Sequence, residues 1–146
     1  FPLREHTKMS ESEIKKEVYA ALDMVALEPQ RVSRLYPDEL SGGMRKRAGL
    51  ARTIILKPKI MLYDEPTTGL DPIISNQISQ MIIKLQKELK ITSVLISHDI
   101  KEAFKCADYA AMLYNGVIIE SNEAERFKNT DNKIIQSFLE GEEIEG

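Results

Sequence analysis

LSGGMRKRAGLARTIILKPKIMLYDEPTTGLD, residues 40–71, is the stretch of this sequence that decides its fold. After the glycine-rich residues 41–43, apolar side chains recur at helical spacing and predict a helix over residues 42–56. The continuous apolar run at residues 60–63 is typical of a strand that is buried on both faces of a parallel sheet. A helix, a buried strand and a turn follow one another here, which predicts an α/β fold with parallel strands covered by helices.

The sequence before this stretch predicts mainly helix. Residues 1–8 are polar and are expected to be extended, whereas the capping box formed by Ser10 and Glu13 begins a predicted helix over residues 11–27. Pro29 is expected to end that helix, and residues 30–40 are expected to be irregular with one helical turn before Pro37.

The sequence after this stretch predicts the rest of the sheet. The expected elements are a helix over residues 72–90, a buried strand at 92–96, a helix to residue 106, a hairpin of strands 109–114 and 117–120 around Asn115-Gly116, one or two short helices after residue 122, and a frayed acidic end at 140–146. Two parallel strands and a hairpin make a thin sheet, so we expect strands from further upstream to complete it.

Composition excludes several classes of protein. A chain of 146 residues that is 42% hydrophobic and 29% charged suits one soluble globular domain, or most of one. A net charge of −3 gives no reason to expect nucleic acid as a partner, and no apolar run approaches the roughly 20 residues that span a bilayer. The single cysteine, Cys106, excludes an internal disulfide, and two histidines are too few for a His/Cys metal cluster.

Asp64 and Glu65 are adjacent carboxylates at the C-terminal end of the predicted strand, the edge where open α/β sheets bind ligands. Side chains alternate along a strand, so the two are expected to point to opposite sides and to have different roles. One carboxylate suits Mg²⁺ that bridges nucleotide phosphates, and the other can orient or deprotonate a water that attacks a γ-phosphate. The alternative is ordinary turn chemistry at a solvated strand end.

Three other segments carry candidate chemistry. Ser41-Gly42-Gly43 begins a helix and exposes backbone N–H groups to an anion, or is an ordinary serine N-cap. His98 follows the second predicted strand and could hydrogen-bond a γ-phosphate, or be a structural hydrogen-bonding residue. Asp71 is a helix N-cap or a link between two sites across an interface. The basic residues 45–47 form either an anion patch or a solvated helix face with one side chain reaching a partner.

These segments together resemble the ATPase domain of ABC transporters. Residues 40–44 resemble the LSGGQ signature, with Met44 in place of the usual glutamine; residues 60–65 resemble the Walker B strand and the catalytic glutamate; residues 69–71 resemble the D-loop, and His98 resembles the switch histidine. The resemblance covers nearly the whole chain. It implies a fragment of a P-loop NTPase-like ABC nucleotide-binding domain, with a C-terminal β-hairpin.

The resemblance also implies how this fragment is divided. Residues 1–40 would be the helical, signature-side subdomain, and residues 41–146 would be the C-terminal part of the α/β core. The phosphate loop G-x-x-x-x-G-K-[ST] does not occur in the sequence, nor does the glutamine loop that follows it in this family. Both would lie before Phe1, so we expect the upstream ATP-binding half to be missing from this sequence.

The resemblance implies a head-to-tail homodimer that binds ATP with Mg²⁺ and hydrolyses the ATP to drive a membrane permease. Asp64 would hold Mg²⁺, Glu65 would be the general base, and His98 would contact the γ-phosphate. Ser41, Gly42 and Gly43 would close on the γ-phosphate bound to the partner, and Asp71 would connect the two sites.

Residues 1–7, 40–44 and 67–72 further resemble the Mla-type ATPases of bacterial phospholipid transporters. That resemblance implies a cytoplasmic subunit, peripheral on the inner face of the cell membrane. Its partners would be a separate permease, an MCE lipid-binding protein and a STAS-domain regulator, with no nucleic acid. Two alternatives remain: a truncated ABC-fold protein that binds a partner without hydrolysing ATP, and a soluble ABC ATPase acting in translation or DNA repair.

Overall fold

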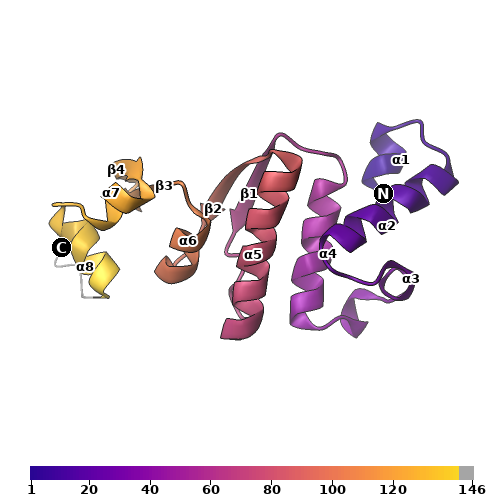
Figure 1. Cartoon of the computed structure of the whole chain (residues 1–146), viewed down its shortest axis with the longest axis horizontal. Coiled ribbons are helices and arrows are strands. Elements are labelled where there is room, and N and C mark those ends of the chain that lie inside the picture. The colour runs from indigo at the N-terminus through magenta and orange to yellow at the C-terminus, as the bar shows by residue number, and fades with distance from the viewer. Residues whose placement is uncertain (142–146) are drawn as a thin grey trace. The chain divides into compact units, whose positions relative to one another are not determined.

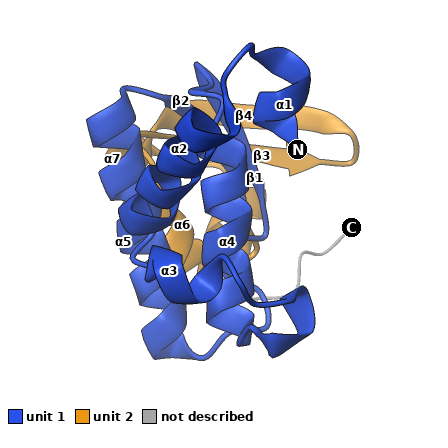
Figure 2. Cartoon of the chain, turned by 90° about the vertical axis from the view of Figure 1, so that its right-hand side faces the viewer, with its two compact units in different colours: residues 1–96 blue, residues 97–146 orange. Residues whose placement is uncertain are grey.

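The computed structural model describes residues 1–141, which form two compact units, residues 1–96 and 97 onward (Figures 1 and 2). Residues 142–146, most of the predicted acidic end, lie outside the described residues. The division after Ile96 differs from the predicted boundary at residue 40, because one hydrophobic core runs from Ala21 to Ile91 across that boundary. The predicted subdomains at residues 1–40 and 41–146 stay a prediction.

The first unit begins with helices. They are α1 (Pro2–His6), α2 (Glu11–Met24), α3 (Pro29–Val32), the 3₁₀ helix η1 (Pro37–Glu39) and α4 (Gly42–Ile54). The prediction that residues 1–8 are extended is wrong: Pro2 lies in the first turn of α1, where its missing N–H costs nothing, and Leu3 is buried. Helix α2 ends earlier than predicted, since Ala26 has φ +53, and Pro29 begins α3 instead of ending α2.

The capping box at the start of α2 is confirmed. The Ser10 hydroxyl accepts a hydrogen bond from Glu13 N at 3.3 Å, and Glu13 Oε2 accepts one from Ser10 N at 2.7 Å. Hydrogen bonds from Ser10 lower the pKa of Glu13, and hydrogen bonds from Arg4 lower the pKa of Glu11, in each case below the ordinary value of 4.5.

The sheet of the first unit is a parallel pair, as predicted. Strand β1 (Ile60–Asp64) pairs with β2 (Thr92–Ile96), with Leu62 opposite Val94 and Asp64 opposite Ile96, and α5 (Pro72–Leu89) connects the two strands. Helices α4 and α5 lie side by side (Figure 1) and contribute to the same core as β1.

Burial of the strands differs from the prediction. Met61 and Tyr63 are 2% and 5% exposed, whereas Ile60 and Leu62 are 62% and 76% exposed. In β2, Val94 and Ile96 are also exposed, so neither strand is buried on both faces. The physical reason is that α4 and α5 pack their apolar residues against one face of the pair, and no other described element covers the opposite face within this unit.

The second unit contains a helix, the hairpin and two short helices. Its elements are α6 (Ile100–Cys106), β3 (Tyr109–Tyr114), β4 (Val117–Glu123), α7 (Ala124–Lys128) and α8 (Lys133–Glu140). The hairpin turn is confirmed at Asn115 and Gly116, whose φ values of +48 and +80 are those that Asn-Gly turns adopt. The second strand continues to Glu123, three residues beyond its predicted end.

Candidate functional site

Ser41 and Asp71 each cap a helix. The Ser41 hydroxyl accepts a hydrogen bond from Met44 N at 3.3 Å at the start of α4. Asp71 Oδ1 accepts hydrogen bonds from the N–H groups of Ile73 and Ile74, both at 3.0 Å, at the start of α5. These side chains therefore have the local roles that the sequence offered as alternatives, and both lie exposed at helix N-termini.

The start of α4 packs against the start of α5. A Cβ atom added to Gly43 would lie 2.9 Å from Ile74 Cγ2, and one added to Gly42 would lie 3.5 Å from Leu70 Cδ2. Cβ atoms essentially never lie this close to another atom, so a side chain at residue 43 would require Ile74 to move. The structure thus brings the predicted signature and D-loop segments together within one chain.

Asp64 and Glu65 lie at the carboxyl end of β1. Asp64 is the last residue of the strand and is exposed. Glu65 leaves the extended conformation with φ +47, while its N–H still donates to the Ile96 carbonyl at 3.0 Å. Glu65 Oε2 accepts a hydrogen bond from the Thr68 hydroxyl at 2.8 Å. The two carboxylates are adjacent at the sheet edge where the sequence predicted them, and only that of Asp64 continues the strand.

The three basic side chains after the glycines each reach a backbone carbonyl. Arg45 Nη1 donates to Leu40 O at 3.0 Å, Lys46 Nζ to Glu65 O at 3.2 Å, and Arg47 Nη1 to Ala26 O at 3.4 Å. These bonds tie α4 to three separate loops of the first unit. The sequence marked the run as basic but gave no sign that Lys46 contacts Glu65.

His98 belongs to the second unit, whereas the other predicted site residues belong to the first. It is exposed and lies just before Asp99, whose Oδ1 accepts a hydrogen bond from Glu102 N at 3.1 Å and so caps α6. Asp99 N donates in turn to the Ser97 hydroxyl at 3.0 Å. The cap is confirmed, and the contact of His98 with a γ-phosphate stays a prediction.

The site suits Mg²⁺ better than a metal held by several side chains. Within residues 1–141, no three His, Cys, Asp or Glu residues group closely enough to hold a metal ion. Asp64 offers one exposed carboxylate, and Mg²⁺ is commonly bound by one or two carboxylates together with waters and substrate phosphates. A cavity of about 170 Å³ beside β1 has both Lys46 and Asp64 among its lining residues.

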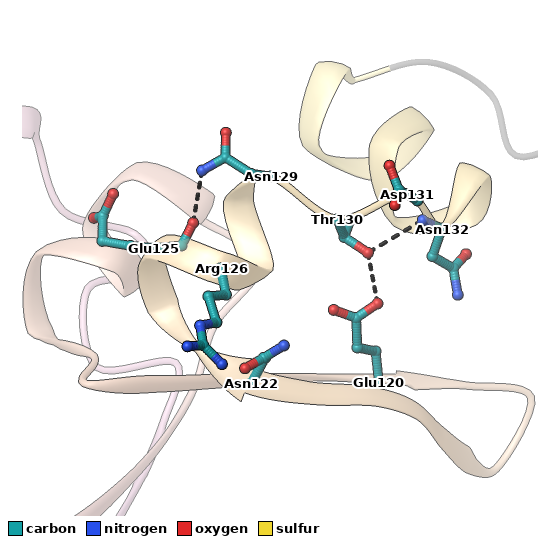
Figure 3. Close-up of a pocket in the computed structure, with 8 residues that line it drawn as sticks. All are labelled: Glu120, Asn122, Glu125, Arg126, Asn129, Thr130, Asp131 and Asn132. Carbon is teal, nitrogen blue, oxygen red and sulfur yellow. Dashed lines mark hydrogen bonds between the residues drawn. The ribbon is translucent and has the colours of Figure 1, made fainter.

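A larger hollow of about 680 Å³ lies in the second unit, between β4, α7 and the loop before α8 (Figure 3). Its polar groups partly satisfy one another: the buried Thr130 donates to Glu120 at 2.5 Å and accepts from Asn132 N at 3.1 Å. None of the predicted site residues lines it.

Comparison with known proteins identifies the family. Residues 1–68 match the family model described as ABC transporter. The chain is 39% identical over 144 residues to the probable ribonucleotide transport ATP-binding protein mkl of Mycobacterium leprae, covering 99% of this chain and 41% of that protein. It is 39% identical over 142 residues to the intermembrane phospholipid transport system ATP-binding protein MlaF of Haemophilus influenzae, covering 97% and 53%. The chain thus spans about half the length of the curated relatives it matches.

Solved structures agree with these relatives. cbiO1 from Clostridium perfringens, part of the ABC transporter complex cbiONQ, superposes with a TM-score of 0.77 at 29% identity, over 93% of this chain and 53% of that chain. The dimeric structure of MJ0796, a bacterial ABC transporter cassette, superposes with a TM-score of 0.70 at 32% identity, over 82% and 50%. The predicted fold class, that of the ABC nucleotide-binding domain, is therefore confirmed. By sequence and by fold, the chain belongs to the ABC transporter ATPases.

Proposed function

We propose that the chain is the C-terminal part of an ATP-binding and ATP-hydrolysing subunit of a bacterial phospholipid transporter. The observation that carries the ATPase part is the position of Glu65 beside Asp64 at the carboxyl end of β1, fixed by bonds to Ile96, Thr68 and Lys46. Relatives about twice as long support the proposal that the phosphate loop lies upstream in the complete protein.

In this proposal, ATP binds between two subunits arranged head to tail. The N–H groups of Gly42 and Gly43 lie in the first turn of α4, where an α-helix supplies them no partner, so they can face the γ-phosphate held by the other subunit. His98 would contact the γ-phosphate held by its own subunit, and Asp71 would connect the two sites. The dimeric structure of MJ0796 supports a dimer of such subunits.

Glu65 would act as the general base that orients and deprotonates the attacking water. Asp64 would hold Mg²⁺, which supplies charge neutralisation at the phosphates when bound. Catalysis would consist mainly of positioning and electrostatic stabilisation. Binding of ATP would close the dimer, and hydrolysis would reopen it.

The partners are proposed on the same basis. Among residues 1–141, no helix is long and apolar enough to cross a membrane. On the pattern of the MlaF relative, a separate permease would carry the lipid, with this subunit cytoplasmic and peripheral on the inner face of the membrane. An MCE lipid-binding protein and a STAS-domain regulator complete the proposed Mla-type system, without nucleic acid. The phospholipid assignment is supported by the MlaF relative, whereas the name of the mycobacterial relative refers to ribonucleotides.

Replacement of Glu65 tests the catalytic part. In the complete protein, Glu65→Gln keeps a side chain of the same size and an oxygen that can accept from Thr68, but it removes the base. We expect ATP binding to persist and the ATPase rate to fall roughly 100-fold or more. Glu88→Gln, which changes an exposed acid on α5, is the matched control and should leave the rate unchanged. Unchanged turnover in Glu65→Gln would remove Glu65 from the proposed role.

The substrate is tested with the ATPase and its permease in detergent micelles that contain no phospholipid. Stimulation of ATP hydrolysis by added phospholipid, but not by added ribonucleotides other than ATP, is the expected result. The reverse pattern would contradict the phospholipid assignment and leave the ATPase assignment intact.

A further inference from the structure

Glu65 adopts a backbone conformation that is disfavoured both by its residue type and by the proline that follows it. Its φ of +47 lies in the left-handed region, which a residue with a long side chain rarely adopts. Pro66 follows it, and a residue before proline prefers extended or polyproline conformations. Contacts from elsewhere in the fold must therefore hold Glu65 in place.

The contacts that hold Glu65 come from three directions. Its N–H donates to the Ile96 carbonyl at 3.0 Å, and its carboxylate accepts from the Thr68 hydroxyl at 2.8 Å. Its carbonyl accepts from Lys46 Nζ at 3.2 Å and from Thr68 N at 3.3 Å. The Lys46 bond is charge-assisted and partly buried, which makes it stronger than a neutral bond exposed to water.

Of the three neighbouring basic residues 45–47, Lys46 is the one whose side chain donates to this loop in the part of the chain that the structure describes. Arg45 bonds to Leu40, and Arg47 bonds to Ala26 and to the Gln77 side chain. Lys46 also lies on the helix whose first turn contains Gly42 and Gly43. One rigid element thus carries both the proposed γ-phosphate contact and a donor to the proposed base.

We propose that Lys46 is a positioning residue for Glu65, an inference that rests on the proposed function. Lys46 would fix the Glu65 carbonyl, and with it the left-handed backbone from which the carboxylate extends. Small displacements of a catalytic group can lower the rate strongly while substrate binding is preserved. Loss of Lys46 should therefore reduce turnover without weakening ATP binding.

The test uses three variants of the complete protein. Lys46→Met removes the donor and keeps the length of the side chain, Lys46→Arg restores a donor, and Arg52→Met removes one positive charge from an exposed position of the same helix. For Lys46→Met we expect kcat to fall about tenfold or more, with the KM for ATP within about twofold of the parent value. Lys46→Arg should recover most of the loss, and Arg52→Met should match the parent.

A second comparison separates this inference from the proposed function. Because Lys46 would act through Glu65, Lys46→Met should cause no further loss of the residual rate in a Glu65→Gln background. If Glu65→Gln abolishes hydrolysis but Lys46→Met behaves like Arg52→Met, only the inference about Lys46 is overturned. If Lys46→Met lowers the melting temperature and kcat together and Lys46→Arg restores neither, Lys46 is structural and the inference is again overturned. If Glu65→Gln hydrolyses ATP at the parent rate, the proposed function fails, and the role of Lys46 fails with it.

Discussion

The two faces of the β1–β2 pair have similar side chains and different surroundings. On one face, Met61 and Tyr63 are buried in the core together with residues of α4 and α5. On the other, Ile60 and Leu62 are exposed, and so are Val94 and Ile96 of the neighbouring strand. The apolar content of a strand therefore indicates that it can be covered, but does not show which of its faces is covered in this chain.

The same contrast separates the proposed catalytic groups. Asp64 continues the alternation of the exposed face, opposite Ile96, whereas Glu65 departs from the strand and is bonded to Lys46 of α4. Glu65 is therefore held in part by α4, a helix that packs on the buried face of the sheet.

The largest expected effect contrasts neighbours on the two faces of β1. In the chain of residues 1–146, Met61→Ala should lower the free energy of unfolding by about 2–5 kcal/mol, because it opens a cavity in the core. Leu62→Ala should change it by no more than about 0.5 kcal/mol, because that side chain is 76% exposed. Urea denaturation followed by circular dichroism measures both. Equal losses of stability in the two variants would mean that the outer face is also covered in solution, which would contradict the difference between the two faces.

The same two variants, Met61→Ala and Leu62→Ala, can also be compared in the complete protein. We propose that upstream strands and helices cover the outer face there, as the relatives' greater length supports. Leu62→Ala should then become destabilising by an amount close to that of Met61→Ala. If Leu62→Ala still leaves the free energy of unfolding unchanged in the complete protein, the proposed cover is contradicted.

An intermediate effect is expected at two glycines of α4. Gly43→Ala would place a methyl group 2.9 Å from Ile74 Cγ2, and overpacking of this kind costs about 1–3 kcal/mol. Gly49→Ala meets no atom within 4 Å and should stabilise the helix by roughly 0.5–1 kcal/mol. Opposite signs in the same denaturation assay would support direct packing between α4 and α5. Two stabilised variants would mean that Ile74 yields easily.

The smallest effect is expected at the exposed capping box of α2. The pKa of Glu13 is lowered by its hydrogen bonds to Ser10, so the folded protein binds a proton there less readily than the unfolded chain. Its contribution to stability is therefore full above the ordinary value of 4.5 and is lost as the pH falls through the folded pKa. Glu13→Gln should lower the melting temperature slightly near neutral pH and not at all in strong acid. An equal difference at every pH would exclude a charge effect.

Local signals in the sequence gave the elements that were predicted correctly. Ser10 with Glu13, Asp71 before Pro72, and Asn115-Gly116 act on backbone groups within three residues, so neighbours alone determine them. The extended prediction for residues 1–8 was wrong because burial of Leu3 outweighed a polar composition.

Contacts between distant residues could not be predicted in this way. No pattern in residues 60–71 indicates that Glu65 is left-handed, since the proline after it favours the opposite. The bond from Lys46 crosses 19 positions of sequence and depends on how α4 packs beside β1. The close approach of Gly43 to Ile74 depends on the same packing. From the sequence alone, the glycine therefore indicated an anion site and not a packing contact.

The conformation of Glu65 also has a consequence for the order of folding. Its N–H can reach Ile96 only after β2 has joined β1, and its carbonyl can reach Lys46 only after α4 has docked. Each contact closes a loop of chain between residues far apart in the sequence, and the entropy of closing that loop is lost before the hydrogen bond can form. We therefore expect both contacts to form late in folding. A partly folded chain would carry the carboxylate without its support. On the proposed function, ATP turnover would then be confined to molecules that had finished folding.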